Sequence, residues 1–311
     1  MAIISAFNSP EVAVLGLTTI FGNVPTAMAT RNALYLTHLA GRSDVPVVPG
    51  ASFSLRGVEK SRVADFVHGV DGFGNTNIEH PEARLFRAFL KIDVNLAPSA
   101  EPAAQFICRM ARAHPGEVVL LALGPLTNLA LALHLDPELP QRLARIVVLG
   151  GAFFGTGNVS PAAEANVFCD PDAAALVFAR CPNLWAVGLD VTHQCMLPRG
   201  EFKGVGGRHG EFLVKISEFY FDYHKRYYSL DCCFVHDGAA FAAVVRPELF
   251  EWAEGAVVVA ADGPTRGHTL MDTSVKEWAG THAWMGLPRV RVAKNVRAAE
   301  VIAFCFERMG A

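Results

Sequence analysis

The sequence lacks the features of a nucleic-acid-binding protein or a membrane protein. Lys and Arg together number 27 and Asp and Glu number 30, so the formal net charge is −3. Binding to phosphate backbones relies on an excess of basic residues, so this near balance of charge argues against a nucleic-acid-binding protein. No stretch reaches the roughly 18 apolar residues of a membrane-spanning helix, and the initial MAIISAF has no positively charged region typical of a signal peptide. We therefore expect a cytoplasmic protein with neither nucleic acid nor membrane as partner.

Paired cysteines and several common catalytic motifs are also missing. The chain has seven cysteines, an odd number, and none of them forms a C-x-x-C pair. In a chain of 311 residues this pattern is typical of reduced, mostly buried cysteines rather than a disulfide framework. No Walker A sequence, no G-x-S-x-G elbow and no H-E-x-x-H zinc motif occurs.

Apolar runs that alternate with amphipathic or Ala-rich segments are present throughout. Continuous apolar strands separated by helices predict one α/β domain, with a largely parallel sheet covered on both faces. The predicted strands are Val12–Ile20, Val45–Val48, Val118–Leu123, Ile146–Leu149, Leu184–Val187 and Gly255–Val259. The predicted helices are Pro25–Ala40, Pro102–Ala113, Leu126–Leu135, Pro171–Ala179, Gly210–Tyr227 and Ala298–Arg308.

Two glycine-containing loops are candidates for ligand binding. Phe21-Gly22-Asn23 follows a predicted strand, where α/β proteins place ligand groups, although a turn that ends the strand explains it as well. The segment 68–74, HGVDGFG, contains G-x-G but neither follows a clear strand nor opens a clear helix. A flexible active-site loop or an ordinary surface loop therefore fits it better than dinucleotide binding.

Polar side chains gather after the Ile146–Leu149 strand, in a loop that contains Asn158, Glu164 and Asn166. A carboxylate and two carboxamides can hold the hydroxyls of a sugar. The alternative is a polar surface loop before a helix that Asp170 caps and Pro171 opens.

A histidine and an aspartate, His236 and Asp237, open an Ala-rich helical segment. Asp237 is either a helix cap or a ligand for a hard cation such as calcium, and taken alone the capping interpretation is favoured. His236 can serve as a neutral hydrogen-bonding group or as a proton donor.

Taken together, these segments resemble the inosine-uridine-preferring nucleoside hydrolase family along essentially the whole chain. The matching stretches are NSPEVAVLGLTTIFGNV (8–24), HGVDGFGNTN (68–77), LALGPLTNLALAL (121–133), VVLGGAFFGTGNVSPAAEANVFCDPDAA (147–174), LDVTH (189–193), FVHDGAA (234–240) and TRGHT (265–269). The resemblance implies a single domain, 1–311, with an open, Rossmann-like, mostly parallel mixed sheet flanked by helices. It also implies hydrolysis of ribonucleosides of the uridine, inosine or xanthosine type to ribose and free base, as in purine and pyrimidine salvage, by a homo-oligomer.

The resemblance assigns each candidate residue a role. Asp237 and the backbone carbonyl of Leu123 are expected to bind Ca²⁺. His236 is expected near the leaving base and His68 on the loop that covers it. The residues expected to hold the ribose are Asn23, Asn158, Glu164 and Asn166. Five aromatic residues of the 210–230 region are candidates for base contacts, although helix packing explains most of them as well: Phe219, Tyr220, Tyr223, Tyr227 and Tyr228.

Two departures from the family pattern are expected to matter. The family opens with a strand and a loop of the form D-T-D-x-G-x-D-D-A-M-A, and this chain starts at the Met-Ala of that motif. Met1–Phe7 has the pattern expected for the interior of a helix, and no N-cap residue precedes it. The segment Pro81–Pro98 is also longer than expected, and Leu85–Leu96 is a possible extra helix.

The sequence alone leaves three functions open. The first is a calcium-dependent nucleoside hydrolase, although the missing aspartates predict slow ribose release by 1–311 alone. The second is a catalytically inactive relative with a binding or regulatory role. The third, a nicotinamide-dependent dehydrogenase, ranks behind both because the chain lacks G-x-G-x-x-G.

Overall fold

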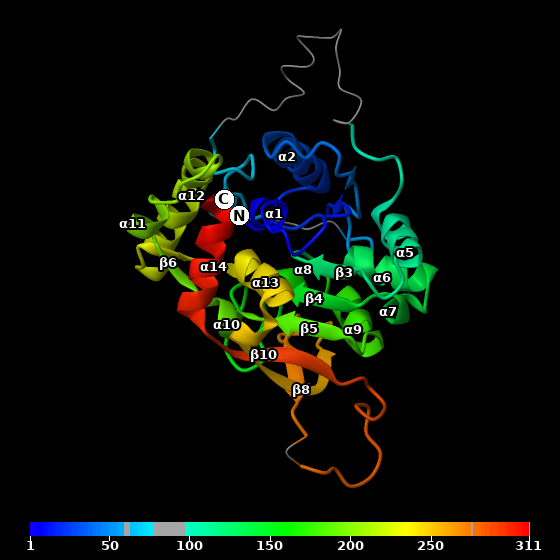
Figure 1. Cartoon of the computed structure of the whole chain (residues 1–311). Helices are drawn as coiled ribbons and strands as arrows, with labels where there is room; N and C mark the ends of the chain where they lie inside the picture. Colours follow the sequence, from blue (N-terminus) through cyan, green and yellow to red (C-terminus); the bar gives the residue numbers. More distant parts are fainter. Residues whose placement is uncertain (59–62, 77–96, 275, 311) are drawn as a thin grey trace.

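A mixed six-stranded sheet forms the centre of the protein (Figure 1). The computed structural model describes residues 1–58, 63–76, 97–274 and 276–310. The strand order is β3-β4-β5-β10-β8-β9, in which β3, β4, β5 and β10 are parallel and the β10–β8 and β8–β9 pairs are antiparallel. The strands are β3 (Val119–Ala122), β4 (Arg145–Leu149), β5 (Leu184–Val187), β8 (Phe250–Val259), β9 (Thr269–Asp272) and β10 (Val290–Val296). The predicted α/β class with a mostly parallel mixed sheet is therefore confirmed.

Apolar side chains of β4 alternate between two hydrophobic cores, one on each face of the sheet. Val147 and Leu149 join the first core, and Ile146 and Val148 join the second. Because both faces are buried, the strand is apolar at consecutive positions. The first core includes residues of α1 (Ala2–Phe7), α10 (Leu189–Thr192), α11 (Arg199–Phe202), α12 (Gly210–Tyr228), α13 (His236–Val245) and α14 (Ala298–Gly310). The second includes residues of α5 (Ala103–Ala113), α6 (Thr127–Leu135), α7 (Leu139–Arg142) and α9 (Pro171–Arg180).

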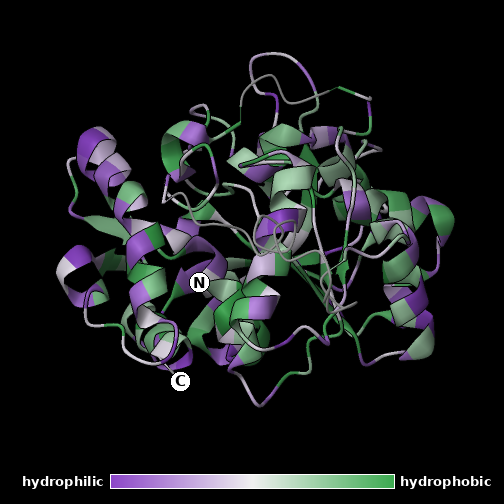
Figure 2. Ribbon diagram, turned by 90° about the horizontal axis from the view of Figure 1, so that it is seen from above, coloured by the Kyte–Doolittle hydropathy of each residue, from purple (hydrophilic) through white to green (hydrophobic). Residues whose placement is uncertain are grey.

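The helices combine hydrophobic and hydrophilic residues, which appear as alternating green and purple along their ribbons in Figure 2. The remaining helices are α2 (Thr26–Leu39), the short α3 (Asp65–His68) and α8 (Ala165–Cys169), and the 3-10 turn η2 (Pro247–Leu249). No helix in the described part of the chain is long and apolar enough to cross a membrane. The seven cysteines, all within the described residues, form no disulfide, and all except the partly buried Cys169 are buried, as predicted.

Two small sheets lie outside the central one. β1 (Leu17–Thr18) pairs in parallel with β2 (Val47–Val48), and β6 (Met196–Pro198) pairs antiparallel with β7 (Cys232–Phe234). The predicted strand Val12–Ile20 is therefore wrong in its extent, because residues 12–16 are not in a strand. Buried Asn128 of α6 joins the β1–β2 sheet to the body: its amide donates to the Thr19 carbonyl at 2.9 Å and accepts from the Ala51 N–H at 2.9 Å.

The predicted helices agree with the observed ones to within a few residues, whereas β6, β7, β9 and β10 were not predicted. Short or antiparallel strands with exposed positions lack the continuous apolar run that marks the parallel strands. The predicted helix over Met1–Phe7 is confirmed as α1, which has no side-chain cap. α1 packs beside α14, so the two ends of the chain lie close together (Figure 1). The possible helix Leu85–Leu96 lies outside the described residues.

A fully buried carboxylate, Asp170, joins three segments around the start of α9. Its oxygens accept the Ala173 N–H at 3.1 Å, the Thr127 hydroxyl at 2.6 Å and the Leu55 N–H at 2.8 Å. Asp170 is therefore the predicted cap of α9, with Pro171 at its first position. The same side chain also attaches α6 and the loop around Leu55.

We expect Asp170→Ala to lower the free energy of unfolding by about 3 kcal/mol, because it removes a helix cap and leaves the buried Thr127 hydroxyl and the partly buried Leu55 N–H without an acceptor. Urea unfolding followed by circular dichroism measures the change. The control is Glu138→Ala, which removes an exposed partner of Arg142 and should cost about 0.5 kcal/mol or less. A loss at Asp170 no larger than that of the control would contradict this account.

Candidate active site

A cavity of about 1040 Å³ opens beside the carboxyl ends of the strands, and the eight residues predicted to bind the ribose and the metal or to lie near the base all line it. Chain segments that follow β1, β3, β4 and β7 contribute to its wall. Ligand sites of open α/β sheets lie at this edge because consecutive parallel strands deliver their loops there. The predicted residues brought together are Asn23, His68, Leu123, Asn158, Glu164, Asn166, His236 and Asp237.

The buried carboxylate of Glu164 organises the polar loop after β4. One of its oxygens accepts the Asn166 N–H at 2.8 Å, and the other accepts the N–H groups of Val167 at 3.0 Å and Gly151 at 3.1 Å. Glu164 therefore caps α8 and closes the loop onto the end of β4. Burial raises the pKa of Glu164, and the three N–H donors oppose part of that rise.

A tight turn places Asn158 next to this carboxylate. The N–H groups of Gly157 and Asn158 donate to the carbonyls of Pro161 and Ala163, both at 3.1 Å. A Cβ atom on Gly157 would lie 2.1 Å from the Ala163 carbonyl oxygen, so only glycine fits there. Asn158 also accepts the Ala165 N–H at 2.9 Å, which fixes its amide beside the start of α8.

The amide of Asn166 connects two strand ends. Its nitrogen donates to the Leu149 carbonyl at 3.0 Å and to the Leu123 carbonyl at 3.4 Å. With its nitrogen bound to backbone, Asn166 has its amide oxygen left for a ligand. The Leu123 carbonyl keeps a second lone pair, so the contact from Asn166 is compatible with a metal on the same oxygen.

Asp237 faces the cavity from the first turn of α13 and makes no capping hydrogen bond. The capping interpretation is therefore wrong for this residue. Burial raises the pKa of Asp237 to about 6. Its side chain is still accessible from the cavity, although protein atoms surround it.

The chemistry of Asp237 fits a hard cation, because a carboxylate that lines the cavity supplies the negatively charged oxygen that such an ion binds. The Leu123 carbonyl in the same cavity is a second ligand of the type that calcium binds. Within the ranges that the structure describes, no group of three or more His, Cys, Asp or Glu side chains is arranged to hold a metal.

The imidazole of His236, the first residue of α13, is held by Thr192, whose hydroxyl lies 2.7 Å from Nδ1. Burial lowers the pKa of His236 to about 3, and the nearby His193, His224 and His68 contribute. The ring is therefore neutral near pH 7 and can donate a hydrogen bond, but it does not carry a positive charge there.

An aromatic wall from α12 faces these polar groups. The ring of His68 stacks on Tyr220, with centroids 5.3 Å apart and planes at 23°. Tyr220, Tyr223 and Tyr228 line the cavity, whereas Phe219 and Tyr227 are not among its lining residues. Helix packing alone therefore does not explain three of the five predicted aromatics. Burial raises the pKa of Tyr223 to about 12, so its phenol stays protonated.

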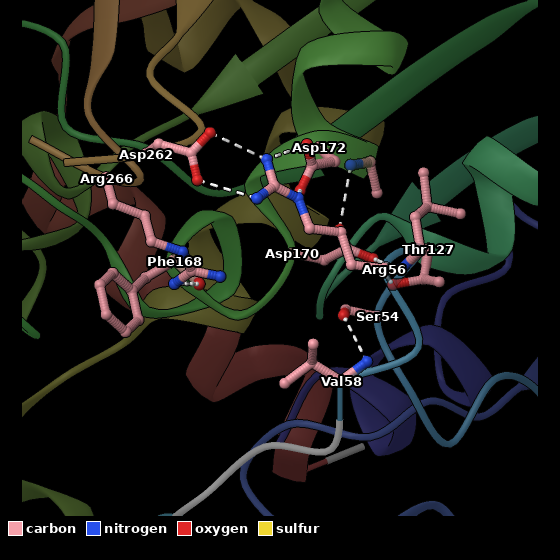
Figure 3. Close-up of polar contacts among 11 residues, drawn as sticks. Ser54, Arg56, Val58, Thr127, Phe168, Asp170, Asp172, Asp262 and Arg266 are labelled. Carbon is pink, nitrogen blue, oxygen red and sulfur yellow. Dashed lines mark hydrogen bonds and ion pairs between the residues drawn. The ribbon is translucent and has the colours of Figure 1, made fainter.

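Two arginines at the rim, Arg56 and Arg266, were not predicted. Figure 3 shows Arg56 between Asp262, at 2.8 Å, and Asp172, at 2.9 Å. Arg266 donates to the Phe168 carbonyl at 2.7 Å, and its guanidinium lies 4.6 Å from the centre of the Phe168 ring. The matching stretch TRGHT contained Arg266, but only the tertiary structure places it beside the cavity.

The comparisons with known proteins agree with the fold. The profile described as "Inosine-uridine preferring nucleoside hydrolase" matches residues 1–303. The chain is 43% identical to "Probable uridine nucleosidase 2" of Arabidopsis thaliana, over 99% of this chain and 93% of that protein. It is 34% identical to "Pyrimidine-specific ribonucleoside hydrolase RihA" of Citrobacter koseri, over 88% of this chain and 84% of that one.

Solved structures give the same result. The "Plant nucleoside hydrolase - PpNRh1 enzyme" superposes with a TM-score of 0.92 at 41% identity, over 100% of this chain and 94% of that chain. The "Purine-Preferring Ribonucleoside Hydrolase from Gardnerella vaginalis" gives 0.87 at 30% identity, over 99% and 93%. The chain belongs to the inosine-uridine preferring nucleoside hydrolase family, as the resemblance predicted. This family is generally metal-dependent.

Proposed function

We propose that the protein hydrolyses the N-glycosidic bond of ribonucleosides and releases ribose and the free base. The observation that carries this proposal is that one cavity contains three kinds of group: a set of carboxamides with a buried carboxylate, a second, accessible carboxylate, and a neutral histidine beside an aromatic wall. The relatives named uridine nucleosidase and ribonucleoside hydrolase support the same reaction.

The polar set is proposed to hold the ribose. Asn158 and Asn166 are both fixed by backbone hydrogen bonds before a ligand arrives, so little conformational entropy is lost on binding. Asn23, at the end of the β1 segment, is proposed to contact the same sugar. Positive charge develops on the ribose as the bond breaks, and the buried carboxylate of Glu164 is placed to stabilise it.

Ca²⁺ is the metal that we propose for the cavity, with Asp237 and the Leu123 carbonyl as ligands. Water and substrate hydroxyls would complete the roughly six to eight oxygens that calcium takes. A bound calcium ion lowers the pKa of an attached water, which makes that water a better nucleophile.

The neutral imidazole of His236 is proposed to donate a hydrogen bond to the departing base, which leaves more easily when its new negative charge is stabilised. His68 and Tyr220 form a stacked pair that is suited to cover a planar base. The homo-oligomeric state and the cytoplasmic location expected from the sequence stay predictions.

The proposed reaction predicts ribose release from uridine or inosine in the presence of calcium, and its loss when a chelator is added. Asp237→Asn should weaken calcium binding at least 10-fold, because it removes the charged ligand, with the folded state retained. Reducing-sugar assays and calorimetric titration of calcium measure the two effects.

The matched control is Asp172→Asn, another acidic residue of the cavity lining, whose carboxylate is already neutralised by Arg56. This variant should bind calcium as the parent protein does. Nucleoside binding without any ribose release would instead support the inactive binding subunit.

Asn166→Ala should lower kcat and raise KM for every nucleoside by similar factors, because its amide contacts the sugar that they share. The matched control is Asn183→Ala. Asn183 also donates from its amide to two backbone carbonyls, those of Pro140 and Leu143, but it lies outside the cavity lining. A change confined to the preference between purine and pyrimidine nucleosides would rule out the ribose assignment.

His236→Ala should slow natural nucleosides by roughly 100-fold or more but spare p-nitrophenyl riboside, whose leaving group departs as a stable anion without a hydrogen-bond donor. Steady-state kinetics on both substrates separates the two effects. Equal losses on the two substrates would give His236 a structural role.

A further inference from the structure

We propose that Thr192 is a positioning residue: its hydroxyl holds His236 in the tautomer that carries a hydrogen on Nε2, with that N–H available to the cavity. The inference rests on the proposed function for its kinetic consequence, and on hydrogen-bond geometry for the tautomer itself. It gives the segment LDVTH a role in the site, although Thr192 is not among the residues that line the cavity.

The contact joins two elements that are distant in sequence. Thr192 ends α10, the short helix after β5, and His236 begins α13, the helix after β7. The Thr192 Oγ1 to His236 Nδ1 distance is 2.7 Å, and Thr192 has no exposed surface. Water therefore does not compete for this contact.

Counting hydrogens decides which atom donates. A threonine hydroxyl carries one hydrogen and needs one acceptor for it. Among the described residues, the contact with Nδ1 is the side-chain hydrogen bond that Thr192 makes. If Nδ1–H donated instead, the hydroxyl hydrogen would be buried without an acceptor, which is costly. The satisfied arrangement has Thr192 donating to Nδ1, and a neutral imidazole then carries its single hydrogen on Nε2.

Two aromatic neighbours pack near the His236 ring. The centroid of His193 lies 5.6 Å from it and that of Phe234 lies 5.8 Å from it. The rings of His193 and Phe234 also pack on each other, with centroids 4.5 Å apart. The hydroxyl of Thr192 therefore sets the tautomer of a ring that packs near these neighbours.

Because Thr192 lies outside the cavity lining, its effect on turnover must pass through His236. Removal of the hydroxyl leaves Nδ1 without its donor and removes the preference for hydrogen on Nε2. The Nε2–H of His236, which donates to the departing base, is then present in only a fraction of the molecules. A substrate whose leaving group needs no donor is unaffected.

The test compares Thr192→Val with Thr192→Ser in the calcium-loaded protein. Thr192→Val keeps the shape but not the hydroxyl, and should lower kcat on uridine and inosine roughly 10-fold or more, with KM and the rate on p-nitrophenyl riboside little changed. Thr192→Ser keeps the donor and should restore most of the rate. In a His236→Ala background, Thr192→Val should have no further effect.

A matched control separates positioning from stability. Thr37 of α2 is a buried threonine outside the cavity lining, and its hydroxyl donates to the Leu34 carbonyl at 2.9 Å. Thr37→Val should cost similar thermal stability and leave both substrates unaffected. An equal loss on nucleosides and on p-nitrophenyl riboside for Thr192→Val would make Thr192 merely structural and overturn the proposal.

Nitrogen-15 NMR of labelled histidine tests the tautomer without any activity. The parent protein should show His236 with hydrogen on Nε2 and a hydrogen-bonded, unprotonated Nδ1, and Thr192→Val should show exchange between tautomers. Hydrogen on Nδ1 in the parent protein would overturn the proposal. If the parent releases no ribose from either substrate, the proposed function fails, and the NMR result still decides the role of Thr192.

Discussion

The buried carboxylate of Glu164 is the group on which the geometry of the site depends. It accepts N–H groups from Gly151, at the end of β4, and from Asn166 and Val167, in the first turn of α8. An uncompensated carboxylate at this depth would be costly, so the loop must fold until its backbone supplies these donors. The same fold of the loop brings Asn158 and Asn166 to one wall of the cavity. The stability of the loop and the position of these two amides in the cavity therefore depend on the same carboxylate.

The cavity is divided into polar and aromatic parts because different strand ends supply them. The segments after β3 and β4 contribute carbonyls, carboxamides and Glu164, whereas α12 contributes tyrosines and the α13 start contributes His236 and Asp237. A ribonucleoside has a matching division, with a sugar rich in hydroxyls at one end and a flat base at the other. Burial shifts the pKa values of the two ionisable groups of α13 in opposite directions, lowering that of His236 to about 3 and raising that of Asp237 to about 6, so near pH 7 the imidazole is neutral and the carboxylate is still ionised.

The rim is held together by side chains that bridge segments distant in sequence. Asp170 attaches α6 and the loop around Leu55 to α9, and Arg56 of that loop pairs with Asp172 of α9 and with Asp262. Loops that border a ligand site gain precision when such contacts attach them to helices and strands. The buried Asp170 is expected to matter more for stability than the exposed ion pairs of Arg56, which water screens.

The sequence by itself determined the α/β class, the longer helices and the parallel strands β3, β4 and β5, because apolar periodicity is a local pattern. The eight candidate site residues followed from loop motifs together with the resemblance to the family. The sequence did not predict β9 and β10, because each mixes buried and exposed positions and has no continuous apolar run. It also left open whether Asp237 caps its helix, and it missed Arg56, Arg266 and the contact between Thr192 and His236. Only the tertiary structure decided these features. Each depends on which side chains from distant segments of the chain come into contact, and a local sequence pattern does not specify such contacts.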